Sequence, residues 1–317
     1  MAERHGHAPV PDDLIQPFQI ENFGVRGRFV RLGPLVDSIL ARHDYPEPVA
    51  AMLGELLALA AVLSGALKFD GVFSVQTRGD GPVRYMVADV TTTGEMRGYA
   101  RFDAARLDRT GRPEDADPGA SEPVPRLLGT GYLSFTVDQG PDTERYQGIV
   151  ELAGATLADC AHNYFRQSEQ MDAAVKLAVG RTLSEGWRAA GMMVQRLPGQ
   201  ARQPVSGEPG DELADDGWRR AVVMMGASTT GELLDSGLHP HRLLYRLFHE
   251  DGVRVYEPVG LSAGCRCSRE RVERTLRSFP RAEIADMKID GKVIVTCEFC
   301  GERYVLDDEA LDALYDA

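Results

Sequence analysis

Four of the five cysteines in this chain lie in two short stretches near its carboxyl end. "AGCRCSRE" places Cys265 and Cys267 one residue apart, and "TCEFCGER" places Cys297 and Cys300 three positions apart. Four sulfur ligands in two such pairs are typical of a structural zinc site, where thiolates surround the ion tetrahedrally. Because residues 265–317 are too few to bury a good core alone, we expect bound metal to hold this segment folded.

The spacing favours one zinc ion per chain, because Cys-x-Cys matches neither common ferredoxin spacing for an iron–sulfur cluster. A closed shell of four sulfurs leaves no position for water or substrate, so we expect no hydrolytic zinc chemistry. Two roles remain open from spacing alone. The site is either a permanent zinc ribbon that folds the tail, or a redox switch whose thiolates release the ion when oxidised.

Composition and charge restrict the partners and the compartment. The 317 residues carry a net charge of -13, which argues against a nucleic-acid partner, since such proteins need a basic face. The first residues, "MAERHGHAPVPDD", have no apolar segment of the kind found in signal peptides. We therefore expect a cytoplasmic protein, and in that reducing compartment clustered cysteines bind metal or serve redox chemistry.

Residues 49–67 form an apolar stretch that nearly reaches the length of a membrane span. Glu55 lies inside it, and a charge near mid-span is costly in lipid. Pro46 and Pro48 suit the first turn of a helix. We therefore expect a helix buried at the centre of a soluble domain, and no membrane partner.

The remaining patterns predict an α+β protein in three parts. Residues 1–200 are expected to form a mixed α/β domain with the central buried helix and an antiparallel sheet. Strands are expected on both sides of the Gly-Asp-Gly-Pro turn, with Val83, Tyr85 and Val87 on one face of the second. The segment 108–125, rich in Pro, Gly and acids, is expected to be a loop.

After residue 200 we expect a helical linker over 201–260 and a zinc-binding domain over 261–317. Thr229 and Glu232 fit a capping box, and Pro240 can open a helix. In the tail, a helix is expected to start at Ser268, and a hairpin is expected to carry Cys-x-x-Cys near its turn.

Several stretches of the chain together match a known family. They are "CRCSRER", "CEFCGERY", "QTRGDGPVRYMVADV", "MRGYAR", "YQGIVEL", "YFRQSEQ" and "GMMVQRLPGQ". Through them the chain resembles the heat-shock protein 33 family, the bacterial redox-regulated holdase chaperones. The likeness extends from about residue 18 to the end, although residues 103–125 look longer than the family's usual loop.

The resemblance implies a function that spacing does not reveal. Family members hold zinc on four thiolates in a reduced, inactive state. Oxidant together with unfolding stress converts these ligands into disulfides, which here would be Cys265–Cys267 and Cys297–Cys300. The tail then unfolds and the linker loses its dock, so that exposed apolar surface holds unfolding client proteins without ATP. The oxidised form is expected to be a homodimer.

Two rival functions predict different features. A zinc-ribbon nucleic-acid binder should have a basic tail, but residues 265–317 carry nine Lys or Arg against twelve Asp or Glu. A thiol–disulfide oxidoreductase would place Cys297 and Cys300 at a helix N-terminus, whereas Gly301 and an expected strand follow them. The remaining cysteine, Cys160, is expected to be a small buried side chain.

Overall fold

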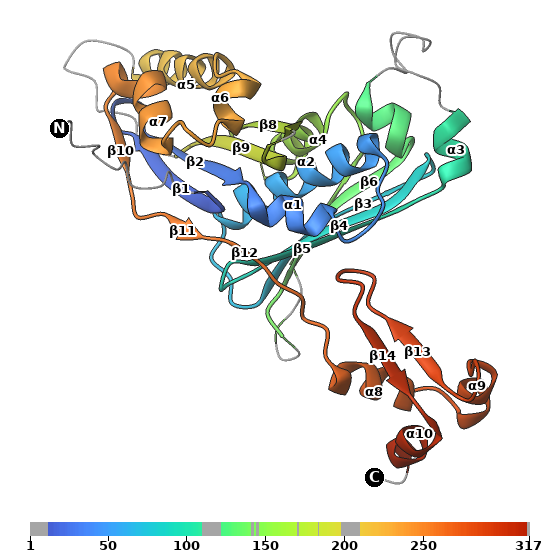
Figure 1. The fold of residues 1–317 in the computed structure, drawn as a ribbon. Helices are drawn as coiled ribbons and strands as arrows, with labels where there is room; N and C mark the ends of the chain where they lie inside the picture. The colour runs from blue at the N-terminus through green and yellow to red at the C-terminus, as the bar shows by residue number, and fades with distance from the viewer. Residues whose placement is uncertain are drawn as a thin grey trace, which may run out of the picture. The chain divides into compact units, whose positions relative to one another are not determined.

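The computed structural model of the chain describes residues 12–109, 122–140, 143, 146–169, 171–182, 184–197 and 210–315. The fold divides into two compact units (Figure 1). The first comprises Met1–Ala41 and Tyr45–Ala263, and the second comprises Arg42–Asp44 and Gly264–Ala317. The predicted α+β class is confirmed.

The first sheet of the first unit is six-stranded, with the order β10-β1-β2-β9-β8 and with β11 also paired to β1. Every pair in this sheet is antiparallel. Its strands are β1 (Leu14–Ile20), β2 (Val25–Leu32), β8 (Ala173–Thr182), β9 (Gly186–Arg196), β10 (Val253–Val255) and β11 (Val259–Gly260).

The second sheet is also six-stranded, with the order β12-β5-β4-β3-β6-β7. All its pairs are antiparallel except that of β12 with β5. Its strands are β3 (Val72–Gly79), β4 (Val83–Thr91), β5 (Glu95–Phe102), β6 (Gly131–Asp138), β7 (Tyr146–Glu151) and β12 (Ser262–Ala263).

Helix α2 (Glu47–Ser64) is the centre of the first unit, as its apolar sequence predicts. Its buried side chains share one core with Val30 and Met193 of the first sheet and with Val75 and Met86 of the second. It is the one helix among the described residues that is long and apolar enough to cross a membrane. Because 78% of it is buried inside the protein, its apolar surface is satisfied by this core.

Smaller helical segments complete the first unit. They are η1 (Glu21–Phe23), α1 (Pro34–Leu40), α3 (Ala104–Arg109), η3 (Val124–Leu128), α4 (Leu157–Tyr164), η4 (Phe165–Glu169) and η5 (His249–Asp251). The predicted loop over 108–125 is wrong at both ends, since α3 runs to Arg109 and Val124 begins the helical turn η3 and is buried. Residues 110–121 of that loop lie outside the described residues.

The predicted hairpin around the Gly-Asp-Gly-Pro turn is confirmed as β3 and β4, but one detail is wrong. The pairing of β4 with β5 shifts register between Val83 and Tyr85. A bulge of this kind adds a residue and reverses which face the following side chains occupy. Val83 is therefore in the core, whereas Tyr85 and Val87 lie on the opposite face, where Tyr85 is partly exposed and Val87 is buried.

Three helices pack on the outer face of the first sheet. They are α5 (Gly210–Gly226), α6 (Thr230–Leu234) and α7 (Pro240–Phe248). They share a second core with that sheet, in which Phe18 stacks on Phe248 with ring centroids 5.6 Å apart. The predicted capping box is confirmed, because the Glu232 amide donates to the Thr229 hydroxyl and the Thr229 amide donates to the Glu232 carboxylate.

The second unit contains a hairpin and three short helices. Its elements are α8 (Arg269–Arg277), α9 (Arg281–Asp286), β13 (Val293–Thr296), β14 (Arg303–Leu306) and α10 (Asp308–Tyr315). The predicted helix start is confirmed, because the Ser268 hydroxyl accepts the Arg271 amide. Helix α9 was not predicted. The buried core is small, comprising Leu276, Ile284, Val293, Leu306, Leu311 and Leu314.

The division into a core over 1–200, a linker over 201–260 and a tail over 261–317 stays a prediction. It concerns which segments separate when the protein is oxidised. In the structure α5, α6 and α7 belong to the first compact unit.

Glu55 provides a test of the core around α2. Burial raises its pKa to about 7, and its Oε2 has no hydrogen-bond partner. A carboxyl with a raised pKa favours folding below its unfolded value of 4.5, and this contribution is lost as the pH rises through about 7.

We expect Glu55→Gln to leave stability nearly unchanged at pH 4 and to raise it at pH 8 by about 3 kcal/mol. Urea unfolding of wild type and variant across this pH range measures the difference. If the difference in unfolding free energy between variant and wild type stayed constant from pH 4 to pH 8, Glu55 would not ionise in the folded core.

Candidate metal centre

The structure brings the four predicted cysteines into one cluster in the second unit. Their sulfurs all lie within 4.8 Å of one another, and each residue is half-buried. Cys265 Sγ lies 3.7 Å from Cys297 Sγ, and Cys267 Sγ lies 3.3 Å from Cys300 Sγ. All four are free thiols. Four sulfurs so arranged could hold one metal ion.

Two different backbone devices present these sulfurs. Cys265 and Cys267 lie in a segment outside any helix or strand, which ends where Ser268 caps α8. Cys297 and Cys300 lie in the turn between β13 and β14, where the Gly301 amide donates to the Cys297 carbonyl at 2.8 Å. Gly301 has a φ of 74°, a conformation that favours glycine. The turn is thus closed directly after the second cysteine.

The thiols perturb one another's ionisation. Burial raises the pKa of Cys265, but the Cys267 amide and the neighbouring thiols oppose this and bring it down to about 7. Burial and the surrounding sulfurs raise the pKa of Cys300 to about 12. Four thiolates therefore do not coexist readily without a cation among them, which is the chemistry expected of a metal site.

Tyr304 was not predicted as part of this centre. Its hydroxyl hydrogen-bonds the sulfur of Cys267, which raises the pKa of the phenol. A hydrogen bond to a ligating sulfur stabilises the thiolate and orients it. Tyr304 lies in the strand that was predicted after Cys300, but nothing in the sequence indicated that its hydroxyl would bind Cys267.

Cys160 and the Cys297–Cys300 pair differ from a redox enzyme's cysteines. Cys160 is fully buried in the first unit, and burial raises the pKa of its thiol to about 11, as expected of an inert side chain. The Cys297–Cys300 turn leads into β14, so this pair is not at a helix N-terminus. That geometry does not match the arrangement expected of a thiol–disulfide oxidoreductase.

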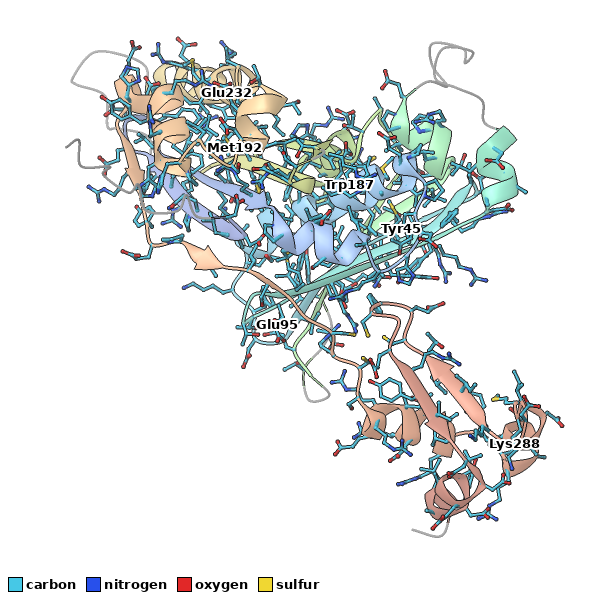
Figure 2. The ribbon with its side chains drawn as sticks, in the orientation of Figure 1. Tyr45, Glu95, Trp187, Met192, Glu232 and Lys288 are labelled. Carbon is cyan, nitrogen blue, oxygen red and sulfur yellow. The ribbon has the colours of Figure 1, made fainter. Side chains whose placement is uncertain are left out.

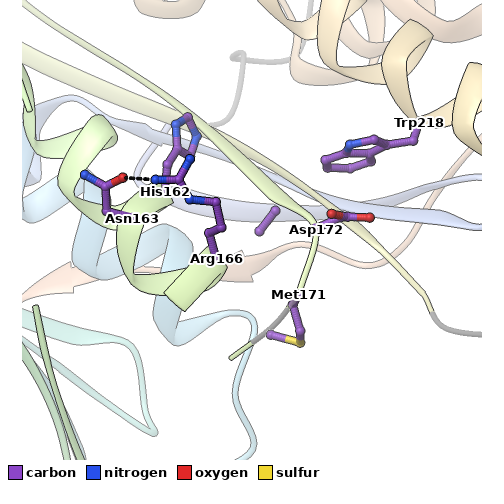
Figure 3. Close-up of a pocket in the computed structure, with 7 residues that line it drawn as sticks. His162, Asn163, Arg166, Met171, Asp172 and Trp218 are labelled. Atoms are coloured by element: carbon purple, nitrogen blue, oxygen red, sulfur yellow. Dashed lines mark hydrogen bonds between the residues drawn. The ribbon is translucent and has the colours of Figure 1, made fainter. Parts of the chain in front are cut away.

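A surface cavity of about 380 Å³ lies between α4, β8 and α5 (Figure 3). The Arg166 guanidinium donates to Asn163 Oδ1 at 3.1 Å, as the figure shows. His162 Nε2 accepts the backbone amide of Val175 at 2.6 Å, and burial lowers the pKa of the imidazole. Because its ring nitrogen is committed to the backbone, His162 is a structural group here.

Cations of the first sheet hold the ends of α5 and α6, which sequence analysis missed. Lys176 Nζ donates to the carbonyls of Gly226 and Ser228, at 2.7 Å to the former. A lysine at such a terminus also interacts favourably with the helix dipole. This contact fixes the carboxyl end of α5 to β8.

Two arginines hold α6 in the same way. Arg31, which is fully buried, donates to the carbonyls of Leu233 at 3.2 Å and of Leu238 at 2.8 Å. Arg188 donates to the Leu234 carbonyl at 2.7 Å and binds the Asp12 carboxylate with Nη2. Met192 of β9 packs in the core between the first sheet and the helices α5–α7. Figure 2 labels Met192, and it labels Glu232 on α6.

The chain is similar to known proteins along nearly its whole length. The model of the Hsp33 protein family matches residues 13–307. A 33 kDa chaperonin of Caulobacter vibrioides is 46% identical over 303 residues, which cover 94% of this chain and 96% of the relative. A 33 kDa chaperonin of Azotobacter vinelandii is 37% identical over 305 residues, which cover 96% of this chain and 94% of the relative.

A crystal structure of a 33 kDa chaperonin, a heat shock protein 33 homologue from Thermotoga maritima, has the same fold. The TM-score is 0.79 at 24% identity, and the match covers 96% of this chain and 98% of that one.

We expect Cys300→Ser to lose the bound metal, because three thiolates and a hydroxyl make a far weaker site than four thiolates. Cys160→Ser is the matched control, since that cysteine lies outside the cluster. Metal content of the two purified variants, measured by mass spectrometry, decides the outcome. Equal metal in both would mean that the ion binds elsewhere.

Proposed function

Because this chain belongs to the Hsp33 family, we propose that it is a redox-regulated, ATP-independent holdase chaperone of the cytoplasm and not an enzyme. The names of its relatives support a chaperone role. The observation that carries the regulatory part of the proposal is the cluster of four half-buried cysteines, whose sulfurs lie within 4.8 Å of one another.

The metal in this proposal is one zinc ion per chain, bound by Cys265, Cys267, Cys297 and Cys300. A tetrahedral site with zinc–sulfur bonds of about 2.3 Å has sulfurs about 3.8 Å apart. The separation of 3.7 Å between Cys265 and Cys297 is close to this value. Zinc binding by such peptides releases roughly 10–16 kcal/mol, which is large beside a core of six buried side chains.

Oxidation would convert the four ligands into disulfides between Cys265 and Cys267 and between Cys297 and Cys300. For each pair, two thiolates, one hydrogen peroxide and two protons give one sulfur–sulfur bond and two waters, and Zn²⁺ leaves. In the structure, contacts at 3.3 Å and 3.7 Å join sulfurs of opposite motifs. Disulfides within each motif would replace these contacts between the motifs.

The linker can respond because short edge strands connect it to the cysteines. Between α7 and Cys265, the chain pairs through β10 and β11 with β1, and through β12 with β5. The last of these strands has two residues and is held by bonds such as that from the Ser262 amide to the Gly94 carbonyl. Such short pairings are easily lost once the tail unfolds.

Release of the linker helices would expose the apolar surface that the proposal needs. The face of the first sheet beneath them carries large apolar side chains, among them Phe18, Phe29 and Met192. The facing helix residues include Met225, Leu243 and Leu247. Contiguous apolar surface of this kind is suited to binding unfolded segments of client proteins, and to forming the homodimer proposed for the oxidised chain.

The two rival functions fit less well. A nucleic-acid-binding ribbon would need a basic tail, whereas this one has a net charge of -3, from nine basic and twelve acidic residues. An oxidoreductase would need Cys297 and Cys300 at a helix N-terminus, whereas they lie in a hairpin turn.

We expect the reduced, metal-loaded protein to leave the aggregation of a heat-labile client unchanged, and peroxide at raised temperature to make it protective. Light scattering of the client measures this, and metal release and free thiols are counted in the same samples. One zinc and four thiols should be lost together as protection appears. Equal protection before and after oxidation would remove the switch from the account.

We expect Lys176→Met to lower the temperature at which peroxide activates the protein. The substitution removes charged hydrogen bonds to the Gly226 and Ser228 carbonyls, worth about 1.5–3 kcal/mol each. Linker release then becomes easier, and the activation temperature should fall by several degrees.

The matched control is Arg181→Met, which removes a cation that lies over the Trp187 ring. Limited proteolysis of α5 in the reduced proteins gives a second readout. If Lys176→Met behaved as Arg181→Met in both assays, the contact would not restrain the linker.

A further inference from the structure

A row of alternating arginine and tyrosine residues crosses the second sheet. Arg101 of β5 pairs with Tyr85 of β4, Tyr85 pairs with Arg78 of β3, and Arg78 pairs with Tyr132 of β6. Side chains directly opposite in a sheet lie on the same face. The four therefore form one transverse row, which is called the Arg–Tyr row below.

The row faces away from the core. The neighbouring positions Thr77, Met86, Ala100 and Leu133 form the adjacent row and are buried. Arg78 and Arg101 are exposed and Tyr132 is 39% exposed. The bulge after Val83 is what brings Tyr85 onto this face. Arg84 joins these residues in lining an open depression of about 600 Å³.

Among the described residues, no acid neutralises the positive charge of the row. No ion pair or hydrogen bond joins the guanidinium of Arg78 or Arg101 to another described residue. Arg84 donates to the Asp80 carbonyl, a neutral group, and the Asp80 carboxylate accepts the Thr130 amide. Glu151 stands beside Tyr132 at the far end. Three guanidinium groups thus remain available in a chain whose net charge is -13.

We propose that the Arg–Tyr row, with Arg84, is a docking surface for acidic segments of polypeptide. The inference rests on the proposed holdase function in one respect, namely that the segments belong to client proteins. The fork of an arginine matches a carboxylate, and arginine and tyrosine are the residue types enriched in protein interfaces. The phenol rings between the guanidinium groups accept apolar or aliphatic parts of the same segment.

Spacing and charge favour a peptide over a nucleic acid. Arg78 and Arg101 are two strands apart, which is roughly 10 Å, a distance that about three residues of extended chain span. Nucleic-acid sites commonly neutralise six to ten phosphates, and this surface has three guanidinium groups on a strongly acidic protein. An acidic peptide needs fewer ion pairs, and its apolar parts can also contact the tyrosine rings.

The test is fluorescence anisotropy with three labelled probes on the full-length protein, reduced and oxidised. The probes are a 16-residue peptide alternating Glu and Ala, its Lys–Ala counterpart, and a 16-nucleotide oligouridylate. We expect the Glu–Ala peptide to bind and Arg78→Gln with Arg101→Gln to weaken it about tenfold, as for two partly exposed ion pairs. Arg26→Gln with Lys68→Gln removes the same charge from exposed positions elsewhere and should leave binding unchanged.

Circular dichroism and metal content first establish that both double variants fold. Equal loss of Glu–Ala binding in the two variants would overturn the proposal, as would no binding by the wild type in either redox state. Oligouridylate binding that only the Arg78 and Arg101 changes abolish, with the Glu–Ala peptide unaffected, would reassign the surface to nucleic acid.

Client protection is measured separately, so the two proposals can fail independently. If the protein binds the Glu–Ala peptide but never protects a client, the holdase proposal is refuted and the docking-surface proposal stands. If the protein protects clients but does not bind the peptide, only the docking-surface proposal is refuted.

Discussion

The coordination bonds that four thiolates can make to one ion are the constraint on which the second unit depends. Its buried core consists of six side chains, supplemented by caps at Ser268 and Asp307. A core of that size contributes little beyond the entropy lost on ordering the chain. The thiols themselves resist joint ionisation, as the pKa of Cys300 near 12 indicates. A cation resolves both problems at once.

Hydrogen bonds from charged side chains hold the linker helices on the first sheet. Lys176, Arg31 and Arg188 bind the carbonyls left free at the ends of α5 and α6. These polar bonds fix the position of the helices. Burial of the apolar side chains between helices and sheet supplies most of the free energy that holds the two layers together. A packed but detachable layer is what a concealed client-binding surface requires.

Much of the fold could be predicted from the sequence because its signals are local. The apolar run around Glu55 predicted the central helix, and the Gly-Asp-Gly-Pro turn predicted β3 and β4. The four cysteines predicted their own cluster, since ligand type and spacing determine such a site. Ser268 and Thr229 predicted helix starts, because a cap acts within three residues of itself.

What the sequence did not reveal depends on contacts between distant residues. The bulge after Val83 reverses the face of Tyr85, and no local pattern announces it. The Arg–Tyr row exists only once four strands are in register. Likewise Arg31 lies more than 200 positions from the carbonyls it binds. Strands β1 and β2 were also missed. They pair with each other, but their other partners, β10, β11 and β9, come late in the chain.

The most direct test of this account follows amide hydrogen exchange in the reduced protein before and after a chelator removes the metal. The account predicts that residues 265–315 lose protection while the strands and the α2 helix of the first unit keep theirs. Unchanged protection of residues 265–315 in the metal-free, reduced chain would contradict it, because the ion would then not be what keeps the second unit folded.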